Sequence, residues 1–121
     1  MAKTALIIDD SLTFRQMVVM ALTDAKFTVI EACNGQDALD KLKGARVDII
    51  ISDVNMPVMD GITFVKTARA QPQLKKTPIL MLTTESQPEM KQQGKAAGAT
   101  GWIVKPFKAA HLIQVVSDLL P

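Results

Sequence analysis

The stretch from Ile49 to Gly61 reads IIISDVNMPVMDG, and it decides the fold class. Three consecutive isoleucines indicate a strand that is buried on both faces, which is typical of a parallel sheet covered by helices. The apolar run stops at Asp53, and a proline and an Asp-Gly turn follow it. A buried strand that ends in an acid needs an explanation beyond packing.

Strand and helix patterns alternate along the whole chain. Short apolar runs predict strands at Thr4–Ile8, Thr28–Ala32, Val47–Ser52, Thr77–Thr84 and Gly101–Val104. Apolar residues at helical spacing predict helices from Ser11 to about Ala25, from Gly35 to about Lys43, after Asp60, after Ser86 and from Ala109 to Leu120. Five strands alternating with five helices predict an α/β fold with a parallel sheet covered on both faces, because each crossover is right-handed.

Helical spacing also predicts which residues face the core. In chain order they are Phe14, Val18, Ala21, Leu22, Ala25, Ala38, Leu39, Leu42, Ile62, Val65, Ala68, Leu112, Val115, Val116 and Leu119. Asp60 should cap the third helix. The fourth helix opens with Ser86-Gln87-Pro88-Glu89, which matches a capping box. Its body is mostly polar and contains Gly94, so we expect it to be the most mobile helix.

Composition restricts the class of protein. With 121 residues, of which 48% are hydrophobic and 21% charged, the chain fits one soluble domain that folds alone. The formal net charge of +2 is too small to indicate nucleic-acid binding. The apolar run that ends at Ile8 is too short for a signal peptide or a membrane span, so we expect a cytoplasmic protein. Cys33 is the only cysteine, which excludes an internal disulfide.

The charges are distributed unevenly along the chain. Residues 1–60 carry nine acidic and six basic side chains, net −3, whereas residues 61–121 carry three acidic and eight basic ones, net +5. Solvated surface lysines are the simplest explanation. The asymmetry also fits an acidic partner that docks on the second half.

Polar side chains follow four of the five predicted strands. Asp9 and Asp10 follow the first strand, Asp53 the third, Thr83 the fourth and Lys105 the fifth. The carboxyl ends of parallel strands are where such folds bind ligands. Three carboxylates gathered there would repel one another unless a cation lay between them. Mg²⁺ prefers oxygen ligands, and no cluster of histidine or cysteine favours zinc or copper.

A magnesium site beside a hydroxyl and a lysine is suited to phosphoryl transfer. Aspartate can act as a nucleophile toward phosphorus, so Asp53 is the candidate acceptor. Each residue alone has a simpler explanation: Asp10 or Ser11 could cap a helix, Asp53 could merely end a strand, and Lys105 could be a surface charge. Their shared position at one edge of one sheet favours a functional site.

Four segments then carry a resemblance to a known family. IIDDS, DVNMPVMDG, MLTTE and GWIVKPF, in this order and across the whole chain, resemble the receiver domains of two-component response regulators. The resemblance is greatest to single-domain chemotaxis regulators of the CheY type. It implies a flavodoxin-like, doubly wound five-stranded sheet with strand order 2-1-3-4-5. It also implies that residues 1–121 form a receiver domain with no output domain.

The resemblance assigns a role to each acid. Asp53 would accept the phosphoryl group from a histidine kinase. Asp9, Asp10, Asp53 and the backbone carbonyl of Asn55 would hold Mg²⁺, with Asp10 and Asp53 as the direct side-chain ligands. Asn55 and Glu85 match the pair usual in fast-hydrolysing chemotaxis members, so we expect the phosphorylated form to last seconds to minutes.

Other residues would respond to the phosphoryl group. Thr83 would hydrogen-bond to it, and Lys105 would pair with it. Lys105 and Pro106 resemble the family's cis peptide, which proline makes accessible. Trp102 stands where the family has a tyrosine or phenylalanine that turns inward on activation, and Thr84 stands where alanine is frequent.

The implied function is a signalling switch rather than an enzyme. A CheA-like histidine kinase would phosphorylate Asp53, and the face made by helix four, strand five and helix five would bind a flagellar motor switch protein or another partner. A monomer with no nucleic-acid or membrane partner is expected. A phosphate sink and a phosphorelay intermediate are the alternatives within the family.

Two other classes of protein share parts of the pattern. A magnesium-dependent phosphatase with an aspartyl-phosphate intermediate needs an acid two residues after its nucleophile, where this chain has Asn55. A flavodoxin-like cofactor binder needs a phosphate loop rich in hydroxyls and glycine after the first strand, where Asp9 and Asp10 would repel a phosphate. Turnover of small phosphate esters would favour the first class, and a yellow protein the second.

Overall fold

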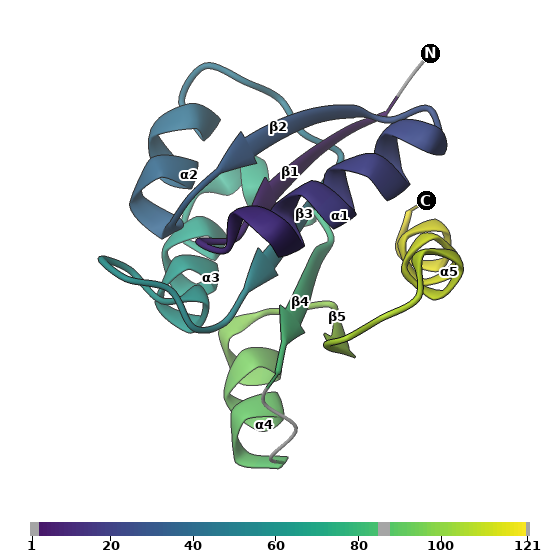
Figure 1. Cartoon of the computed structure of the whole chain (residues 1–121). Helices are drawn as coiled ribbons and strands as arrows, with labels where there is room; N and C mark the ends of the chain where they lie inside the picture. The colour runs from purple at the N-terminus through teal and green to yellow at the C-terminus, as the bar shows by residue number, and fades with distance from the viewer. Residues whose placement is uncertain (1–2, 85–87, 121) are drawn as a thin grey trace.

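The computed structural model describes residues 3–84 and 88–120. The strands are β1 (Thr4–Ile8), β2 (Thr28–Ala32), β3 (Ile49–Asp53), β4 (Ile79–Thr83) and β5 (Gly101–Val104). The helices are α1 (Leu12–Asp24), α2 (Gly35–Leu42), α3 (Gly61–Arg69), the short 3₁₀ helix η1 (Pro72–Leu74), α4 (Pro88–Ala97) and α5 (Ala109–Leu119). Strand and helix alternate in the predicted way (Figure 1).

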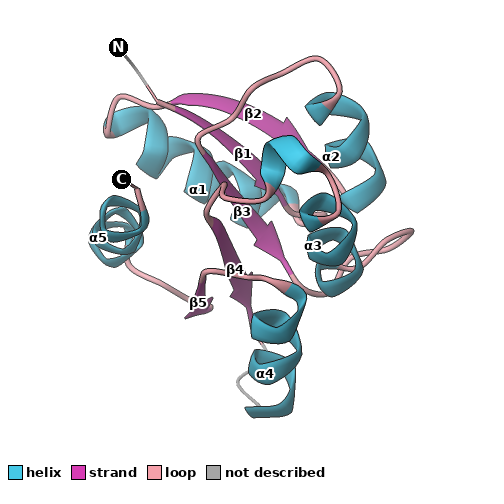
Figure 2. Cartoon of the chain, turned by 180° about the vertical axis from the view of Figure 1, so that it is seen from behind, coloured by secondary structure: helices cyan, strands magenta, loops and turns pink. Residues whose placement is uncertain are grey.

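The five strands form one parallel sheet in the order β2-β1-β3-β4-β5, which confirms the predicted order (Figure 2). The strand β3 lies at its centre, where Ile50 is paired with Leu6 of β1 and with Ile79 of β4. All five residues of β3 are buried. The acid at its end is therefore fixed by strands on both sides.

Each face of the sheet is covered by its own apolar layer. The helices α2 and α3 and the end of α4 cover one face through residues that include Leu39, Phe64 and Ala97. The helices α1 and α5 cover the other face through residues that include Leu22 and Val116. The two layers hold the sheet rigidly and leave its carboxyl edge to carry polar groups.

Side-chain caps begin three of the helices. The Ser11 hydroxyl accepts a hydrogen bond from the backbone N–H of Phe14 at 3.3 Å. The side-chain oxygen Oδ1 of Asn34 accepts one from the backbone N–H of Asp37 at 2.8 Å. Asp60 caps α3 by accepting from the N–H of Thr63 at 2.9 Å, as predicted. Ser86 and Gln87 of the predicted capping box lie outside the described residues.

Two predicted strand boundaries and some inward positions were wrong. The strand predicted at Thr77–Thr84 is Ile79–Thr83. The strand predicted at Val47–Ser52 is Ile49–Asp53, because its pairing begins at Ile49 with Ala5 and extends to Asp53 with Leu82. Ala25 is the C-cap of α1 and is half-buried. Phe64, which the prediction passed over, is fully buried in α3.

Phe14 also differs from its predicted place in the core. It is half-buried, and it is not among the described side chains that form or flank the two apolar layers. Helical spacing predicts that Phe14 lies on the face of the helix turned toward the sheet, but it does not predict which residues the ring contacts.

The opposite, amino edge of the sheet has an open hollow of about 1000 Å³. Its lining includes both ends of the described chain, Lys3 and Leu120, with Asp48 and Pro78 from the starts of β3 and β4. Within residues 3–84 and 88–120, none of the helices has the length and apolar character needed to cross a membrane.

Candidate functional site

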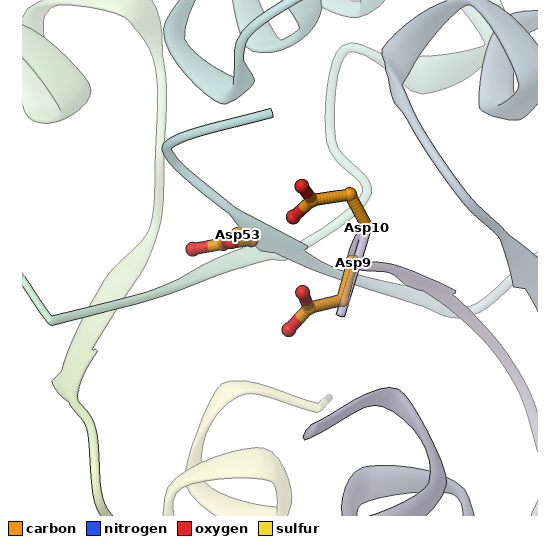
Figure 3. A group of neighbouring side chains, drawn as sticks. All are labelled: Asp9, Asp10 and Asp53. Carbon is orange, nitrogen blue, oxygen red and sulfur yellow. The ribbon is translucent and has the colours of Figure 1, made fainter. Parts of the chain in front are cut away.

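The register of β1 and β3 brings two acids together. Ile8 is paired with Ser52, so the next residues, Asp9 and Asp53, lie side by side at the carboxyl ends of β1 and β3. Asp10 follows at once, and Figure 3 shows its carboxylate on the same side as the other two. Oxygen atoms of the three carboxylates all lie within 4.8 Å of one another. The predicted acidic cluster at the carboxyl edge is therefore present.

Lys105 supplies the positive charge of this cluster. Its Nζ lies 2.8 Å from Oδ2 of Asp9 and 3.6 Å from Oδ1 of Asp53. The side chains of Lys105 and Asp9 are only 4% and 3% exposed, so the pair is shielded from solvent. Lys105 contributes one positive charge to a cluster of three carboxylates, so the cluster keeps a formal excess of negative charge.

The backbone after β5 ties Lys105 to the end of β4. Its N–H donates to the carbonyl oxygen of Thr83 at 2.7 Å, and the Lys105-Pro106 peptide bond is cis, as the resemblance implies. Thr83 is fully buried. The structure therefore brings Thr83 and Lys105 to the same edge as the acids.

Burial dominates the electrostatics of Asp53. It raises the pKa of the carboxyl from 3.8 to about 6, with smaller upward contributions from Asp9 and Asp10. Lys105 and a 2.8 Å hydrogen bond from the Val54 N–H to Oδ1 act in the opposite direction. At neutral pH the carboxyl is thus mostly ionised, which a nucleophile requires.

Gly61 allows the loop after β3 to close against Asp53. A Cβ atom at Gly61 would lie 2.1 Å from the backbone oxygen of Asp53, which no side chain could tolerate. The Gly61 N–H donates to the carbonyl oxygen of Val54 at 2.8 Å. In the sequence, Asp60 and Gly61 indicate only a turn and a cap, because a close approach between elements leaves no local signal.

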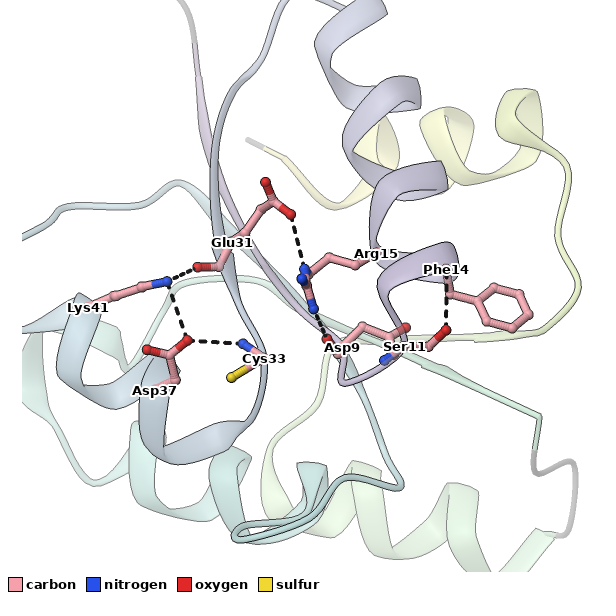
Figure 4. A network of polar contacts seen from close by, with 8 residues as sticks. All are labelled: Asp9, Ser11, Phe14, Arg15, Glu31, Cys33, Asp37 and Lys41. Carbon is pink, nitrogen blue, oxygen red and sulfur yellow. Dashed lines mark hydrogen bonds and ion pairs between the residues drawn. The ribbon is translucent and has the colours of Figure 1, made fainter.

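Arg15 holds the acidic loop from the side of α1. Its Nη1 donates to the backbone oxygen of Asp9 at 2.7 Å, and its Nε donates to Glu31 at 3.0 Å (Figure 4). The Ser11 N–H donates to Oδ1 of Asp9 at 2.9 Å. The sequence interpretation assigned Arg15 no role, although its place one turn after the two acids was the available signal.

The donor set fits a divalent ion that prefers oxygen. Ligands at about 2.0–2.1 Å on an octahedral Mg²⁺ lie about 3 to 4 Å apart, and rotation of the exposed Asp10 side chain would close the small remaining difference. Both oxygens of Asp9 already accept hydrogen bonds, from Ser11 and Lys105. Among the described residues, no hydrogen bond reaches the Asp10 carboxylate or Oδ2 of Asp53, which leaves these two acids as the available direct ligands.

The remaining predicted site residues lie away from the three carboxylates or outside the described residues. Asn55 is exposed on the loop two residues beyond Asp53. Trp102 is half-buried on β5, where it packs against the layer that contains α4. Glu85 lies outside the described residues, and Pro106 is exposed.

Comparisons with known proteins agree with this fold. Residues 5–117 match the family model of the response regulator receiver domain. The chain is 44% identical over 115 residues to the chemotaxis protein CheY-3 of Vibrio cholerae, covering 94% of this chain and 88% of the relative. Its identity to the chemotaxis protein CheY of Pseudomonas aeruginosa is 36% over 115 residues, covering 94% and 93%.

A solved structure is similar over almost every residue. The chemotaxis response regulator CheY4 of Vibrio cholerae superposes with a TM-score of 0.95 at 54% identity, covering 99% of this chain and 100% of that one. The acids and the lysine converge at the carboxyl edge of a sheet with this strand order, in a chain that matches the family model over nearly its whole length. The chain therefore belongs to the family of response regulator receiver domains.

Proposed function

We propose that Asp53 accepts a phosphoryl group from a histidine kinase with the help of Mg²⁺, and that phosphorylation changes which partner the protein binds. The observation that carries the proposal is the cluster itself. A buried carboxylate at the end of the central strand lies beside two further acids and a shielded ammonium group.

The chemistry is a direct displacement at phosphorus. An oxygen of the ionised Asp53 carboxylate forms a bond to phosphorus as the P–N bond to the donor histidine breaks, and the imidazole leaves with the electron pair. The Val54 N–H fixes the rotation of the carboxylate by its hydrogen bond to Oδ1. Holding the nucleophile in one orientation lowers the entropic part of the barrier.

The residues around Asp53 would stabilise the transferred group. Asp10 and Asp53 would bind Mg²⁺ directly with the Asn55 carbonyl, and Asp9 would bind it through water, since both its oxygens are already engaged. When bound, Mg²⁺ supplies positive charge beside the phosphoryl oxygens. Lys105 would move from Asp9 toward the new phosphoryl group, and the Thr83 hydroxyl would donate a hydrogen bond to it.

The proposed output is a change on the face made by α4, β5 and α5. Lys105 and Thr83 are joined by a backbone hydrogen bond, so movement at one is transmitted to the other. Trp102 lies on β5 and packs toward α4, so its large side chain is part of this face. A CheA-like kinase and a flagellar motor switch protein are the proposed partners, in keeping with the chemotaxis proteins that this chain resembles.

Other uses of the same chemistry remain distinguishable by experiment. A phosphate sink or a relay intermediate would accept the phosphoryl group equally but would not change affinity for a motor protein. A magnesium-dependent phosphatase would turn over small phosphate esters, for which an acid would be needed where Asn55 stands. The Asn55 and Glu85 pair supports rapid loss of the phosphoryl group, so a phosphorylated sample that persisted for a day at neutral pH with Mg²⁺ would contradict this part of the proposal.

The central test is incubation with acetyl phosphate and Mg²⁺, followed by intact-mass measurement. We expect one added phosphoryl group in the wild type and none in Asp53→Asn, because an amide cannot act as the nucleophile. The matched control is Asp60→Asn, which retains a capping side chain away from the cluster. Phosphorylation of Asp53→Asn, or none of the wild type, would overturn the proposal.

A further inference from the structure

The ammonium group of Lys105 has a third contact besides its two carboxylates. Its Nζ lies 4.2 Å from the centre of the Phe14 ring. Figure 4 shows Phe14, without Lys105, on the first turn of α1. A cation at this distance from an aromatic face is attracted by the negative charge of the ring's π-system. Phe14 is therefore part of the surroundings of the phosphorylation site.

Packing in the core does not explain this position. Phe14 is half-buried and stands outside the described side chains of both apolar layers, whereas Phe64 in α3 is fully buried in one of them. The side chain of Lys105, in contrast, is only 4% exposed. The ring of Phe14 thus lies against the shielded ammonium group and not within the described side chains of either apolar layer.

An aromatic ring holds a cation differently from a carboxylate. A hydrogen bond to an oxygen is directional and is lost when the donor turns away. Attraction to a ring face varies gradually with the position of the cation, so the ammonium group can shift while it stays in contact. This property suits a lysine that must exchange one anionic partner for another.

We infer that Phe14 is a positioning residue for phosphoryl transfer. Its ring holds the Lys105 ammonium beside Asp53 and supports it while the ammonium exchanges Asp9 for the phosphoryl group. The inference rests on the proposed function of Asp53, and it adds a residue of α1 to the groups that act on the transferred phosphate. Phe14 makes no contact with the phosphate itself and acts through Lys105.

The first test compares Phe14→Leu with Phe14→Tyr and Phe14→Trp. Leucine keeps an apolar side chain without a ring, while tyrosine and tryptophan keep the aromatic face. With acetyl phosphate and saturating Mg²⁺, we expect Phe14→Leu to lower the maximal phosphorylation rate about three- to tenfold, with a smaller change in the half-saturating donor concentration. We expect Phe14→Tyr and Phe14→Trp to remain within about twofold of the wild type. Urea unfolding of each variant shows whether it is folded under the assay conditions.

A fluorination series separates the cation–π attraction from shape. Phenylalanines with one, two and three ring fluorines at position 14 change the ring's volume little but weaken its negative face step by step. We expect the maximal rate to fall stepwise with fluorination. A rate that does not change across the series, in a wild type that accepts phosphate, would overturn the inference.

A measurement without phosphate tests the contact between Phe14 and Lys105 independently of phosphorylation at Asp53. In the NMR spectrum of the unphosphorylated protein without metal, ring currents of Phe14 should displace the Lys105 ε-methylene signals. We expect Phe14→Leu to remove this displacement and Phe14→Tyr to keep it. Unchanged Lys105 signals in Phe14→Leu would overturn the inference itself. A wild type that fails to accept phosphate, with the displacement present, would instead overturn the proposed function and leave only the contact between Phe14 and Lys105.

Discussion

The Asp53 side chain is 10% exposed at the end of the central strand, and burial raises its pKa from 3.8 to about 6. The ionised form, which would attack phosphorus in the proposed reaction, is therefore destabilised in the folded protein relative to the unfolded chain. A carboxyl group in the unfolded chain ionises near pH 4. As the pH rises from about 4 to 6, ionisation of Asp53 therefore increasingly favours the unfolded state.

This disadvantage predicts the effect of Asp53→Asn on stability. Below about pH 4 both states hold the proton, and the wild type carries no penalty; as pH rises through about 6, a penalty of up to about 3 kcal/mol develops and then stays constant. Asparagine does not ionise. Without divalent ions at pH 7.5, we expect Asp53→Asn to have a free energy of unfolding about 1–3 kcal/mol above that of the wild type.

Urea unfolding followed by Trp102 fluorescence at several pH values between 3.5 and about 7.5 would measure this difference. The excess stability of Asp53→Asn should shrink as pH falls below the folded pKa of about 6. A wild type that is the more stable of the two at pH 7.5 would contradict the prediction.

Gly61 gives a second prediction for a single residue. A methyl group in Gly61→Ala would meet the backbone oxygen of Asp53, which cannot move without disturbing β3. We expect the free energy of unfolding to fall by at least about 2 kcal/mol. The control is Gly44→Ala, where nothing lies within 4 Å of the added carbon, and its stability should lie within about 1 kcal/mol of the wild type. Equal stability of the two variants in urea would show that the contact is not rigid.

At the scale of elements, α4 and β5 meet through a glycine and an indole. A Cβ atom at Gly94 would lie 2.6 Å from Cζ3 of Trp102 and 3.5 Å from the Cδ1 atom of Ile62. The glycine weakens α4 as a helix, by about 1 kcal/mol relative to alanine. In exchange it lets the ring of Trp102 lie close against the helix.

We expect Gly94→Ala to displace the indole toward solvent. Trp102 is the only tryptophan, so the emission maximum of the protein reports its environment alone. The maximum should move to longer wavelength in Gly94→Ala and stay unchanged in Gln93→Ala, which alters an exposed neighbour on the same helix. An emission spectrum of Gly94→Ala identical to that of the wild type would mean that α4, rather than the ring, has moved.

At the scale of the whole molecule, one sheet with an apolar layer on each face links the acidic edge to global stability. Because the acids lie at the ends of β1 and β3, and these strands also contribute to both layers, unfolding would destroy the proposed metal site together with the core. An ion that binds only the folded state then stabilises the entire domain.

Magnesium should therefore raise the midpoint of thermal unfolding. Above the dissociation constant, each tenfold increase in Mg²⁺ concentration adds about 1.4 kcal/mol to the free energy of unfolding. We expect Asp10→Asn to weaken this response strongly and Asp40→Asn, which alters an exposed acid of α2, to preserve it. Calorimetry with EDTA and then with increasing Mg²⁺ gives the comparison, and equal responses of the two variants would place the ion elsewhere.

The parts of the fold and site that follow simple spacing rules were predictable from sequence. The isoleucine run before Asp53 predicted the central parallel strand, and the positions of Asp9 and Lys105 after their strands predicted that they would meet it. These predictions depend on periodicity and on the geometry of a parallel sheet, both of which are visible in the chain order.

The contacts between distant elements were not predictable in this way. Phe14 has the spacing of a core residue, and only the folded chain shows that a lysine from the far end of the sequence lies over its ring. The close approach of Gly61 to Asp53 and the bond from Arg15 to the Asp9 backbone likewise depend on how loops close. The secondary-structure preferences of neighbouring residues do not indicate these distances between elements.

The hollow at the amino edge of the sheet has a practical consequence. Lys3 and Leu120 both line it, so the two ends of the described chain emerge on the side away from the three carboxylates. A fluorescent reporter or a surface tether joined at either end would leave the reactive edge open to solution. Under the proposed function, immobilised protein should accept a phosphoryl group from a soluble donor as readily as the free protein does.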